Sequence, residues 1–502
     1  MVARRGSGRR YSLVLMPATL GAMVVAALSL GGSAAASSTI TVYCNHNGGT
    51  PNLQSTIDSN LAPTIRITGT CVGNFHVDGS VTTVPLTLQG GAPGATLDGS
   101  SSGAVLKVFG GATVTLKKLT VTNGEGGSLS GGGIDVQDCP DTVVNLSSVT
   151  VTGNDAQEGG GIFVGTCATV NLTSSHVNGN TAFAGAGIYA EDGAMVNLYY
   201  STVNSNSTGT DSGIGAGIYA DAATVLVKSS VVSDNGDPYE GGGIYAFDSE
   251  VTLINSTVSD NQSDGIGGIY GGGGIWMQGS DVYLTGSHVT GNSSGDYGGG
   301  IAYYGGAGVC AAADAPCAYP DVGLTITNST IDQNTADARG GGIYAWAQEG
   351  DTSVTINGGS TVMSNTVTDG NGGGVYNYAK NCNSAMLWTD QTAFVENSAA
   401  DGRGGAIYNA VGTTSCGTAS VTLSRTQVTR NNQAADGGGI FNLGTDGETA
   451  SVTLEHGTDV TFNRASEMGG GVYDCANATL SIQSSSVVIH NDPDNIFSGP
   501  CG

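Results

Sequence analysis

Four acidic residues recur just after a repeated aliphatic position in the middle of the chain. They lie three or four residues beyond Ile188, Ile218 and Ile244. Grouped carboxylates are ligands of Ca²⁺, and with a basic side chain they perform lyase chemistry on acidic sugars. The nearby base is Lys228, so we expect a solvated acidic turn, with Ca²⁺ binding as the alternative. The four residues are Glu191, Asp192, Asp221 and Asp248.

Other catalytic patterns are missing from the sequence. A galacturonase-like hydrolase needs paired aspartates and a Gly-His-Gly turn, and the chain has neither an Asp-Asp pair nor a Gly-His-Gly. Arg339 and Arg403 share a position four residues before Ile343 and Ile407, with Asn371 between them, so they could face a sugar. We assign no catalytic residue.

An aromatic residue directly follows the repeated aliphatic position in most repeats. If the aliphatic side chain points into a core, the period of two in a strand sends the ring to the opposite face. A column of such rings could bind sugars or an apolar partner, or could stabilise the sheet by stacking. The candidate ligand-binding residues are Phe163, Tyr189, Tyr219, Tyr245, Trp276, Tyr344, Tyr376 and Tyr408, and Phe441 and Tyr473 continue the series.

The elements that position these side chains follow from a repeat. A Gly-rich tetrapeptide ending in an aliphatic anchor recurs every 26 to 42 residues. Between anchors lie two alternating Val/Thr stretches, such as 251–253 and 256–258, which predict short strands. No tight hairpin joins them, so each unit must pair in parallel with its neighbours, one coil per unit. The anchors are Ile134, Ile162, Ile188, Ile218, Ile244, Ile275, Ile301, Ile343, Val375, Ile407, Ile440 and Val472.

An asparagine follows the second stretch of each unit. Asparagine tolerates a left-handed backbone, and its amide can hydrogen-bond the same amide one coil above and below. We therefore predict a structural asparagine ladder beside the glycine turns. Its members are Asn123, Asn154, Asn180, Asn206, Asn235, Asn261, Asn292, Asn334, Asn365, Asn397, Asn431, Asn463 and Asn491.

The cysteines are even in number, 10 in all, and are spaced for disulfides. Two pairs occupy matching positions in adjacent repeats, and stacked coils lie close enough for a disulfide to join them. Three further pairs complete the pattern, although spacing alone does not fix connectivity. The predicted pairs are Cys139–Cys167, Cys382–Cys416, Cys44–Cys71, Cys310–Cys317 and Cys475–Cys501.

The patterns together predict an all-β, right-handed parallel β-helix of about a dozen or more coils. A short N-terminal capping helix is expected to carry Leu53, Ile57 and Leu61 on one face. We expect residues 1–36 to be a signal peptide, 37–122 the N-terminal cap and first coils, 123–491 the repeat β-helix, and 492–502 a C-terminal tail pinned by a disulfide.

The first 36 residues have the order of a signal peptide. Arginines come first, then an uncharged apolar run over 13–30, then Ala34, Ala35 and Ala36. Export predicts a secreted or cell-surface protein with oxidised cysteines and no membrane insertion after cleavage. The net charge of −26 argues against nucleic acid and acidic polysaccharides as partners.

Two segments carry a family resemblance. Residues 394–397 (Phe-Val-Glu-Asn) followed by 404–407 (Gly-Gly-Ala-Ile) resemble the polymorphic outer-membrane protein repeat family, and the other repeats are relaxed versions. Residues 39–123 look like the first coils of secreted pectin-lyase-like proteins, most clearly at 69–71 and 97–99. The resemblance implies a surface-exposed or secreted β-helix, often with adhesive duties.

These observations favour a secreted or surface-exposed, adhesin-like binding scaffold whose partners are glycans or surface proteins. A polysaccharide-active enzyme (a pectate-lyase-like lyase, hydrolase or epimerase) and an inert structural spacer are the alternatives. Exposed rings favour binding and buried rings favour the spacer. A cleft over the acidic residues with a cation beside it favours the enzyme.

Overall fold

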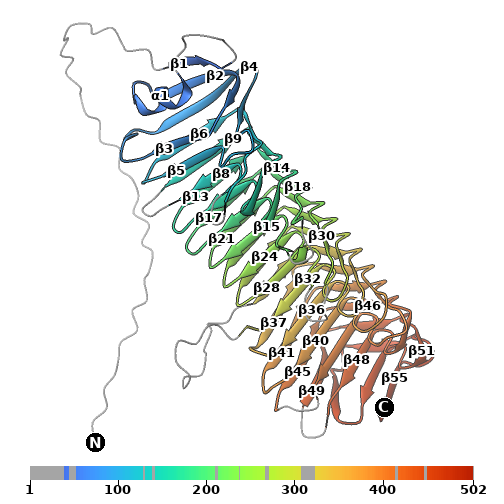
Figure 1. Cartoon of the computed structure of the whole chain (residues 1–502). Helices are drawn as coiled ribbons and strands as arrows, with labels where there is room; N and C mark the ends of the chain where they lie inside the picture. The colour runs from blue at the N-terminus through green and yellow to red at the C-terminus, as the bar shows by residue number, and fades with distance from the viewer. Residues whose placement is uncertain are drawn as a thin grey trace, which may run out of the picture. The chain divides into compact units, whose positions relative to one another are not determined.

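A computed structural model describes most of the chain after the predicted signal peptide. The described residues are 39–44, 52–127, 131–137, 142–209, 213–236, 238–265, 271–306, 323–412, 416–445 and 449–500. They belong to one compact unit, built from parallel strands that stack coil upon coil in chain order (Figure 1). Within these residues, no helix has the length and apolarity to cross a membrane.

One 15-stranded sheet begins each of its repeat strands at an anchor, and we name it the anchor sheet. Anchor pairs with anchor from coil to coil, as Ile162 does with Ile188. The anchors are fully buried because every second side chain of these short strands points into the core. The strands are β3 (Phe75–Asp78), β5 (Leu106–Phe109), β8 (Ile134–Val136), β12 (Ile162–Val164), β16 (Ile188–Ala190), β20 (Ile218–Asp221), β24 (Ile244–Phe247), β28 (Ile275–Gln278), β32 (Ile301–Tyr304), β36 (Ile343–Ala347), β40 (Val375–Ala379), β44 (Ile407–Val411), β48 (Ile440–Leu443), β52 (Val472–Cys475) and β55 (Ile496–Gly499).

The first Val/Thr stretch of each repeat forms a ladder of longer strands, the long ladder. Alternate side chains are buried, as Val170 and Leu172 are in β13. The strands are β6 (Thr113–Lys117), β9 (Val143–Ser147), β13 (Thr169–Thr173), β17 (Met195–Tyr199), β21 (Thr224–Lys228), β25 (Glu250–Ile254), β29 (Asp281–Thr285), β33 (Leu324–Thr327), β37 (Thr352–Asn357), β41 (Ser384–Asp390), β45 (Thr418–Ser424), β49 (Thr449–Glu455) and β53 (Ala478–Ile482).

The second stretch forms a ladder of three-residue strands, the short ladder, whose central residue enters the core. The strands are β7 (Thr120–Thr122), β10 (Thr150–Thr152), β14 (His176–Asn178), β18 (Thr202–Asn204), β22 (Val231–Ser233), β26 (Thr257–Ser259), β30 (His288–Thr290), β34 (Thr330–Asp332), β38 (Thr361–Met363), β42 (Ala393–Val395), β46 (Gln427–Thr429), β50 (Asp459–Thr461) and β54 (Val487–Ile489).

A third set of strands lies between the short ladder and the next anchor. These form three small sheets rather than one continuous sheet. They are β11 (Asp155–Glu158), β15 (Thr181–Ala184), β19 (Gly213–Ile214), β23 (Pro238–Glu240), β27 (Gln262–Ser263), β31 (Ser293–Ser294), β35 (Thr335–Ala336), β39 (Thr366–Val367), β43 (Ser398–Ala399), β47 (Ala434–Asp436) and β51 (Ala465–Met468). The strands predicted at the anchor and at the two Val/Thr stretches are confirmed, and this additional small strand makes four in most coils.

The N-terminal coil is closed by a helix. Strands β1 (Thr39–Tyr43), β2 (Thr64–Val72) and β4 (Leu86–Asp98) begin the solenoid, and α1 (Leu53–Asp58) buries Leu53 and Ile57 against it. The side chain of Asn52 caps α1 by accepting a hydrogen bond from the Gln54 N–H. Leu61 was predicted to share the apolar face, but α1 ends at Asp58 and Leu61 is 73% exposed.

The predicted asparagine ladder is confirmed from Asn154 to Asn491. Each side-chain N–H donates to the next side-chain oxygen at 2.8 to 3.0 Å. Two details of the prediction were wrong. Asn123 lies one residue before the ladder position, since it is Gly124 whose N–H bonds Asn154. The left-handed residue is the one preceding the asparagine, such as Asp260 before Asn261.

The disulfides Cys44–Cys71 and Cys382–Cys416 form between adjacent coils, with Cα atoms 4.8 and 4.3 Å apart. The other three predicted pairs each include a residue outside the described ranges, namely Cys139, Cys310, Cys317 or Cys501. Those pairs remain predictions.

The corner between the anchor sheet and the long ladder varies in length. Only two residues separate β28 from β29, whereas β32 ends at Tyr304 and β33 begins at Leu324. The register is unchanged on both sides, since Val282 pairs with Leu324 and Tyr304 pairs with Trp346. The connection therefore lengthens without shifting the coils.

Candidate functional site

The aromatic residues after the anchors form a stacked column on the outer face of the anchor sheet. From Phe163 to Trp276 the ring centroids of neighbours lie 4.2 to 5.5 Å apart, with nearly parallel planes. The column resumes from Tyr344 through Tyr376 and Tyr408 at 4.9 to 5.3 Å. Stacking of this kind stabilises the parallel register of the coils.

The column is interrupted at one coil. Ala302 occupies the ring position between Trp276 and Tyr344. Tyr304, two residues further along β32, points to the same side and brings its ring to 5.6 Å from Trp276 and 5.5 Å from Tyr344. The rings there are tilted or edge-on instead of stacked, so the surface is uneven at this coil.

Most rings of the column are buried. Phe163, Tyr245, Trp276, Tyr344, Tyr376 and Tyr408 are nearly inaccessible, and only Tyr189 and Tyr219 are half-buried. The preceding turns cover the rings, as Tyr297 does by stacking on Tyr344 at 4.8 Å. A continuous open column of rings is therefore not the binding surface.

Arg339 and Arg403, which the sequence analysis considered as sugar contacts, also help to cover the rings of the column. The Arg339 guanidinium lies 5.1 Å from the centroid of Tyr297 and 5.5 Å from that of Tyr376. Arg403 lies 5.0 Å from the centroid of Phe441 and pairs with Asp436 at 3.5 Å. Both guanidinium groups are held by cation–π contacts over rings. The sequence left open that they face a sugar or a carboxylate, and the structure shows both in intramolecular contacts.

A second aromatic column lies beside the gap. Tyr304, Trp346 and Tyr378 occupy the third position after their anchors and pair in register on β32, β36 and β40. A pocket of about 290 Å³ opens where the two columns meet. It is lined by Trp276, Gln278, Tyr304, Gly305, Trp346, Gln348 and Glu349.

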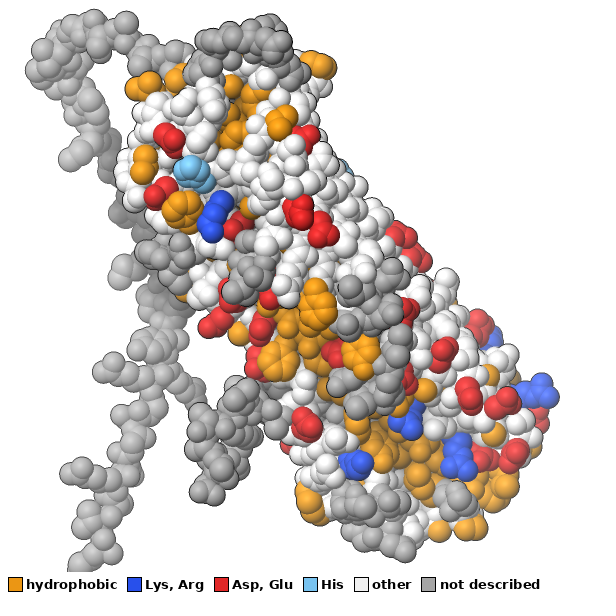
Figure 2. Space-filling model, in the orientation of Figure 1, with side chains coloured by type: hydrophobic (Ala, Val, Ile, Leu, Met, Phe, Trp, Pro, Cys, Tyr) orange, Lys and Arg blue, Asp and Glu red, His pale blue; other side chains and the backbone are white. Residues whose placement is uncertain are grey.

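The pocket combines apolar rings with hydrogen-bonding groups. Gln278 and Gln348 provide amide donors and acceptors, and Glu349 provides a carboxylate. The indole N–H of Trp276 is buried and has no acceptor among the described residues. Figure 2 shows hydrophobic side chains gathered in the middle of one face with Asp and Glu around them, and a second gathering toward the C-terminal end with Lys and Arg.

The four predicted calcium candidates share one corner of the solenoid. Glu191 and Asp221 occupy equivalent positions on neighbouring coils, and Asp192 and Asp248 each lie one residue further along. Burial and repulsion from Asp248 and Asp192 raise the pKa of the Asp221 carboxyl. Among the described residues, however, no three acidic, histidine or cysteine side chains converge to hold a metal ion.

Carboxylates also precede the anchors, on the opposite side of the rings from the corner that holds Glu191 and Asp221. Burial raises the pKa of Glu240 to about 7, although a hydrogen bond from the Tyr245 hydroxyl opposes the shift. Glu158 lies on the same side, four residues before its anchor, and burial with repulsion from Glu191 raises its pKa. Burial, together with the charges of Asp221, Glu240 and Glu158, therefore raises the pKa of the Tyr219 hydroxyl.

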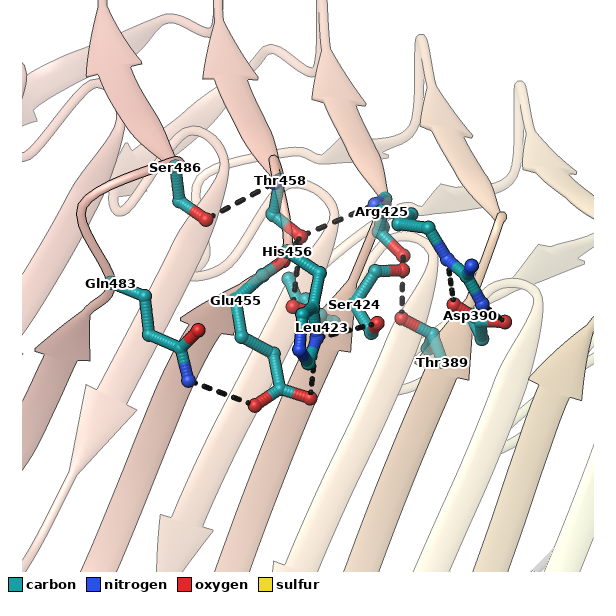
Figure 3. A network of polar contacts seen from close by, with 11 residues as sticks. Thr389, Asp390, Leu423, Ser424, Arg425, Glu455, His456, Thr458, Gln483 and Ser486 are labelled. Atoms are coloured by element: carbon teal, nitrogen blue, oxygen red, sulfur yellow. Dashed lines mark hydrogen bonds and ion pairs between the residues drawn. The ribbon is translucent and has the colours of Figure 1, made fainter.

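A serine, a histidine and a glutamate meet at the turn between the long and short ladders (Figure 3). Ser424 Oγ and the Glu455 carboxylate each lie 3.3 Å from His456 Nδ1. A catalytic relay needs the serine and the acid on opposite ring nitrogens. Because both contacts use one nitrogen, this group is a surface network, which continues to the Asp390–Arg425 pair.

Comparison with known protein families matches residues 103–273 to the right-handed β-helix region. The fold is a right-handed parallel β-helix. The matched coils include Tyr189 and Tyr219 and end just before Trp276, so the match concerns the fold and not the pocket. Neither the comparison with curated proteins nor the comparison with solved structures found a match.

One pattern in the sequence could have predicted the pocket. Aromatic residues stand at the third position after three consecutive anchors, at Tyr304, Trp346 and Tyr378, and the first of these repeats has Ala302 in the ring position. The buried Glu240 carried a weaker signal, because it shares with Glu158 the place four residues before an anchor.

Proposed function

We propose that the protein is an exported β-helix scaffold that binds neutral glycans in the pocket between β28 and β36. The observation that carries the proposal is the gap at Ala302. Among the described residues, it leaves Trp276, Tyr304 and Trp346 lining a pocket in a sheet most of whose rings are covered.

The composition of the pocket supports a sugar ligand. Sugar rings present apolar C–H faces that stack on aromatic rings, and their hydroxyls bond amides and carboxylates. Gln278 and Gln348 supply amides that can bond sugar hydroxyls. A buried donor without an acceptor, the Trp276 indole N–H, favours a ligand that brings an oxygen.

The charge of the chain supports neutral rather than acidic sugars. The net charge is −26, and Glu349 lines the pocket itself. The net negative charge would oppose binding of an acidic polysaccharide. The leader-like residues 1–36 and the resemblance to surface-exposed repeat proteins favour a secreted or cell-surface location for such a scaffold.

The test is retention of the purified mature protein on neutral glucan, mannan and chitin oligosaccharides, with an acidic galacturonan as comparison. We expect Trp346→Ala to weaken binding of the retained sugar about 10-fold, since it removes a ring from the pocket. Trp388→Ala is the matched control, because Trp388 is half-exposed on the long ladder, away from the pocket. Equal loss in both variants, or retention only on galacturonan, would contradict the proposal.

A hydrolase is the second candidate, favoured by the carboxyls around Tyr219. A carboxylic acid that stays protonated near pH 7 can act as a general acid opposite a second carboxylate. Both Glu240 and Asp221 lie near enough to Tyr219 to raise the pKa of its hydroxyl, and burial raises the pKa of Glu240 to about 7. The same panel, read for new reducing ends, separates the candidates, because release that disappears in Glu240→Gln would favour the enzyme.

A further inference from the structure

A second pocket lies on the turns between the short ladder and the small third strands β47 and β51. Its volume is about 590 Å³, and small-molecule sites span about 300 to 1,000 Å³. Two adjacent coils line it, since Arg430 and Asn432 come from one coil and Phe462, Arg464 and Ser466 from the next. It shares no lining residue with the pocket between β28 and β36.

Phe462 has an unusual conformation for its residue type. It is the residue before the ladder asparagine Asn463, and its backbone is left-handed, with a φ of 56°. In every other coil from residue 153 onward, glycine or a polar residue occupies this place, because bulky side chains rarely adopt it. The Phe462 side chain is nevertheless 59% exposed, so burial does not offset the strain. Strain of this kind often accompanies a ligand site.

One face of the Phe462 ring is open. His490, from the following coil, stacks on the other face with ring centroids 5.4 Å apart and planes inclined by 13°. No described ring or guanidinium group stacks on the open face, which is turned toward the coil of Arg430 and lines the pocket. An open aromatic face suits the apolar C–H face of a sugar ring.

Two arginines of the pocket have guanidinium groups available for a ligand. The basic residues after residue 400 are four arginines, of which Arg403 and Arg425 are held in ion pairs with aspartates. Arg430 is exposed and has no acidic partner among the described residues. Arg464 Nε lies 3.5 Å from an Asp492 oxygen, but these side chains are 74% and 73% exposed, so the pair is weak.

We propose that this pocket binds a sugar that carries one carboxylate, such as a terminal uronic acid. The guanidinium groups of Arg430 and Arg464 bind the carboxylate, and the open face of Phe462 stacks on the sugar ring. Asn432 and Ser466 supply hydrogen bonds to its hydroxyls. The net charge of −26 opposes a polyanion, whereas a single carboxylate meets two positive charges in the pocket. The site is independent of the pocket for neutral glycans.

The test is titration calorimetry of the purified mature protein with glucuronyl-glucose, and with cellobiose as the neutral disaccharide. We expect glucuronyl-glucose to bind with a dissociation constant of about 1 mM or lower. Arg430→Gln should weaken this binding at least 10-fold and leave any binding of cellobiose unchanged, because it removes a bond to the carboxylate. Arg425→Gln is the matched control. It removes the same charge from the same coil away from the pocket and should change the dissociation constant by less than about 2-fold.

A second variant separates binding from folding. Asparagine tolerates the left-handed backbone but lacks the ring. Phe462→Asn should therefore weaken glucuronyl-glucose binding about 10-fold while the melting temperature stays constant or rises. Trp346→Ala should leave this binding unchanged, because Trp346 lines only the other pocket.

Several outcomes would overturn the proposal. They are no saturable binding of glucuronyl-glucose, equal effects of the two glutamine variants, and a loss of binding in Trp346→Ala. Equally tight binding of an N-acetylated peptide with a free carboxylate would also overturn it, since the pocket would then recognise the ends of protein chains.

Discussion

At the scale of single residues, the side-chain amides of the asparagine ladder connect adjacent coils through hydrogen bonds. Asn261 accepts hydrogen bonds from the backbone and side chain of Asn235, and it donates to Val232 and Asn292. Its side chain is fully buried. Each amide therefore hydrogen-bonds polar groups of the coils on both sides, which would otherwise be buried without a hydrogen-bond partner.

Removing one amide should be costly. We expect Asn261→Ala to lower the free energy of unfolding by about 3 kcal/mol, because it leaves several buried donors and acceptors unpaired. The neighbouring Gln262 is exposed, so Gln262→Ala should change stability by less than about 0.5 kcal/mol. Urea unfolding followed by circular dichroism measures both values, and equal midpoints would show that the ladder does not stabilise the fold.

The buried Glu240 gives the stability a pH dependence. Its pKa is raised from 4.5 to about 7, so the folded protein holds this proton at pH values where the unfolded chain has lost it. This carboxyl's contribution to stability is therefore fully present below about pH 4.5, declines between about pH 4.5 and 7 by on the order of 3 kcal/mol, and is constant above. In Glu240→Gln this decline should vanish. Thermal melts of both proteins across that range measure it, and an unchanged slope in the variant would refute the assignment.

The ring column shows where residue-level reasoning reaches its limit. The alternation of side chains along a strand correctly predicted that Tyr245 and Tyr344 lie on the outer face of the sheet, because side-chain direction is a local property of a strand. Their burial depends on turns and on residues from other coils, such as Tyr297 and Arg339. A periodic pattern contains no information on such contacts, so the accessible site was missed.

At the scale of elements, the anchor spacing was sufficient to predict parallel pairing and register. Each coil repeats the same interior positions in its anchor strand, long strand and short strand, and a slip by one residue would expose all of them. The small third strands were not anticipated as three separate sheets. Strands such as β27 and β31 are two residues long and carry polar residues, so they lack the alternation by which strands are recognised.

The first coil depends on a covalent link between elements. Cys44 at the end of β1 is bonded to Cys71 in β2, 27 residues away. We expect replacing both cysteines with serine to cost about 3 kcal/mol, through a less constrained unfolded chain. Because solenoid coils depend mainly on their neighbours, the loss should be local.

Hydrogen exchange can locate that loss. Faster exchange should appear in β1, α1 and β2 of the double serine variant, with little change at β13. Uniform acceleration along the whole solenoid would contradict a local role for the disulfide.

At the scale of the whole molecule, charge acts on stability. Acidic residues outnumber basic ones by 41 to 15, so the folded chain repels itself along its length. Raising the ionic strength from about 10 to about 150 mM shortens the screening length from about 30 to about 8 Å. The melting temperature should therefore rise by a few degrees.

Scanning calorimetry in sodium chloride and in potassium chloride measures the effect of screening. The two salts should act alike, because screening depends on ionic strength. A melting temperature that falls with salt would show that favourable ion pairs, such as Lys107–Asp135, outweigh the repulsion.

The corner between the anchor sheet and the long ladder has a consequence for how such a protein can change. Gln348 and Glu349 lie at this corner and line the pocket, and one coil lengthens here while Val282 and Leu324 stay paired. Insertions and deletions can therefore accumulate along one stripe without disturbing the core that folds the chain. Inherited variation would then alter what is recognised while the framework persists, and an engineer could graft foreign loops at the same stripe.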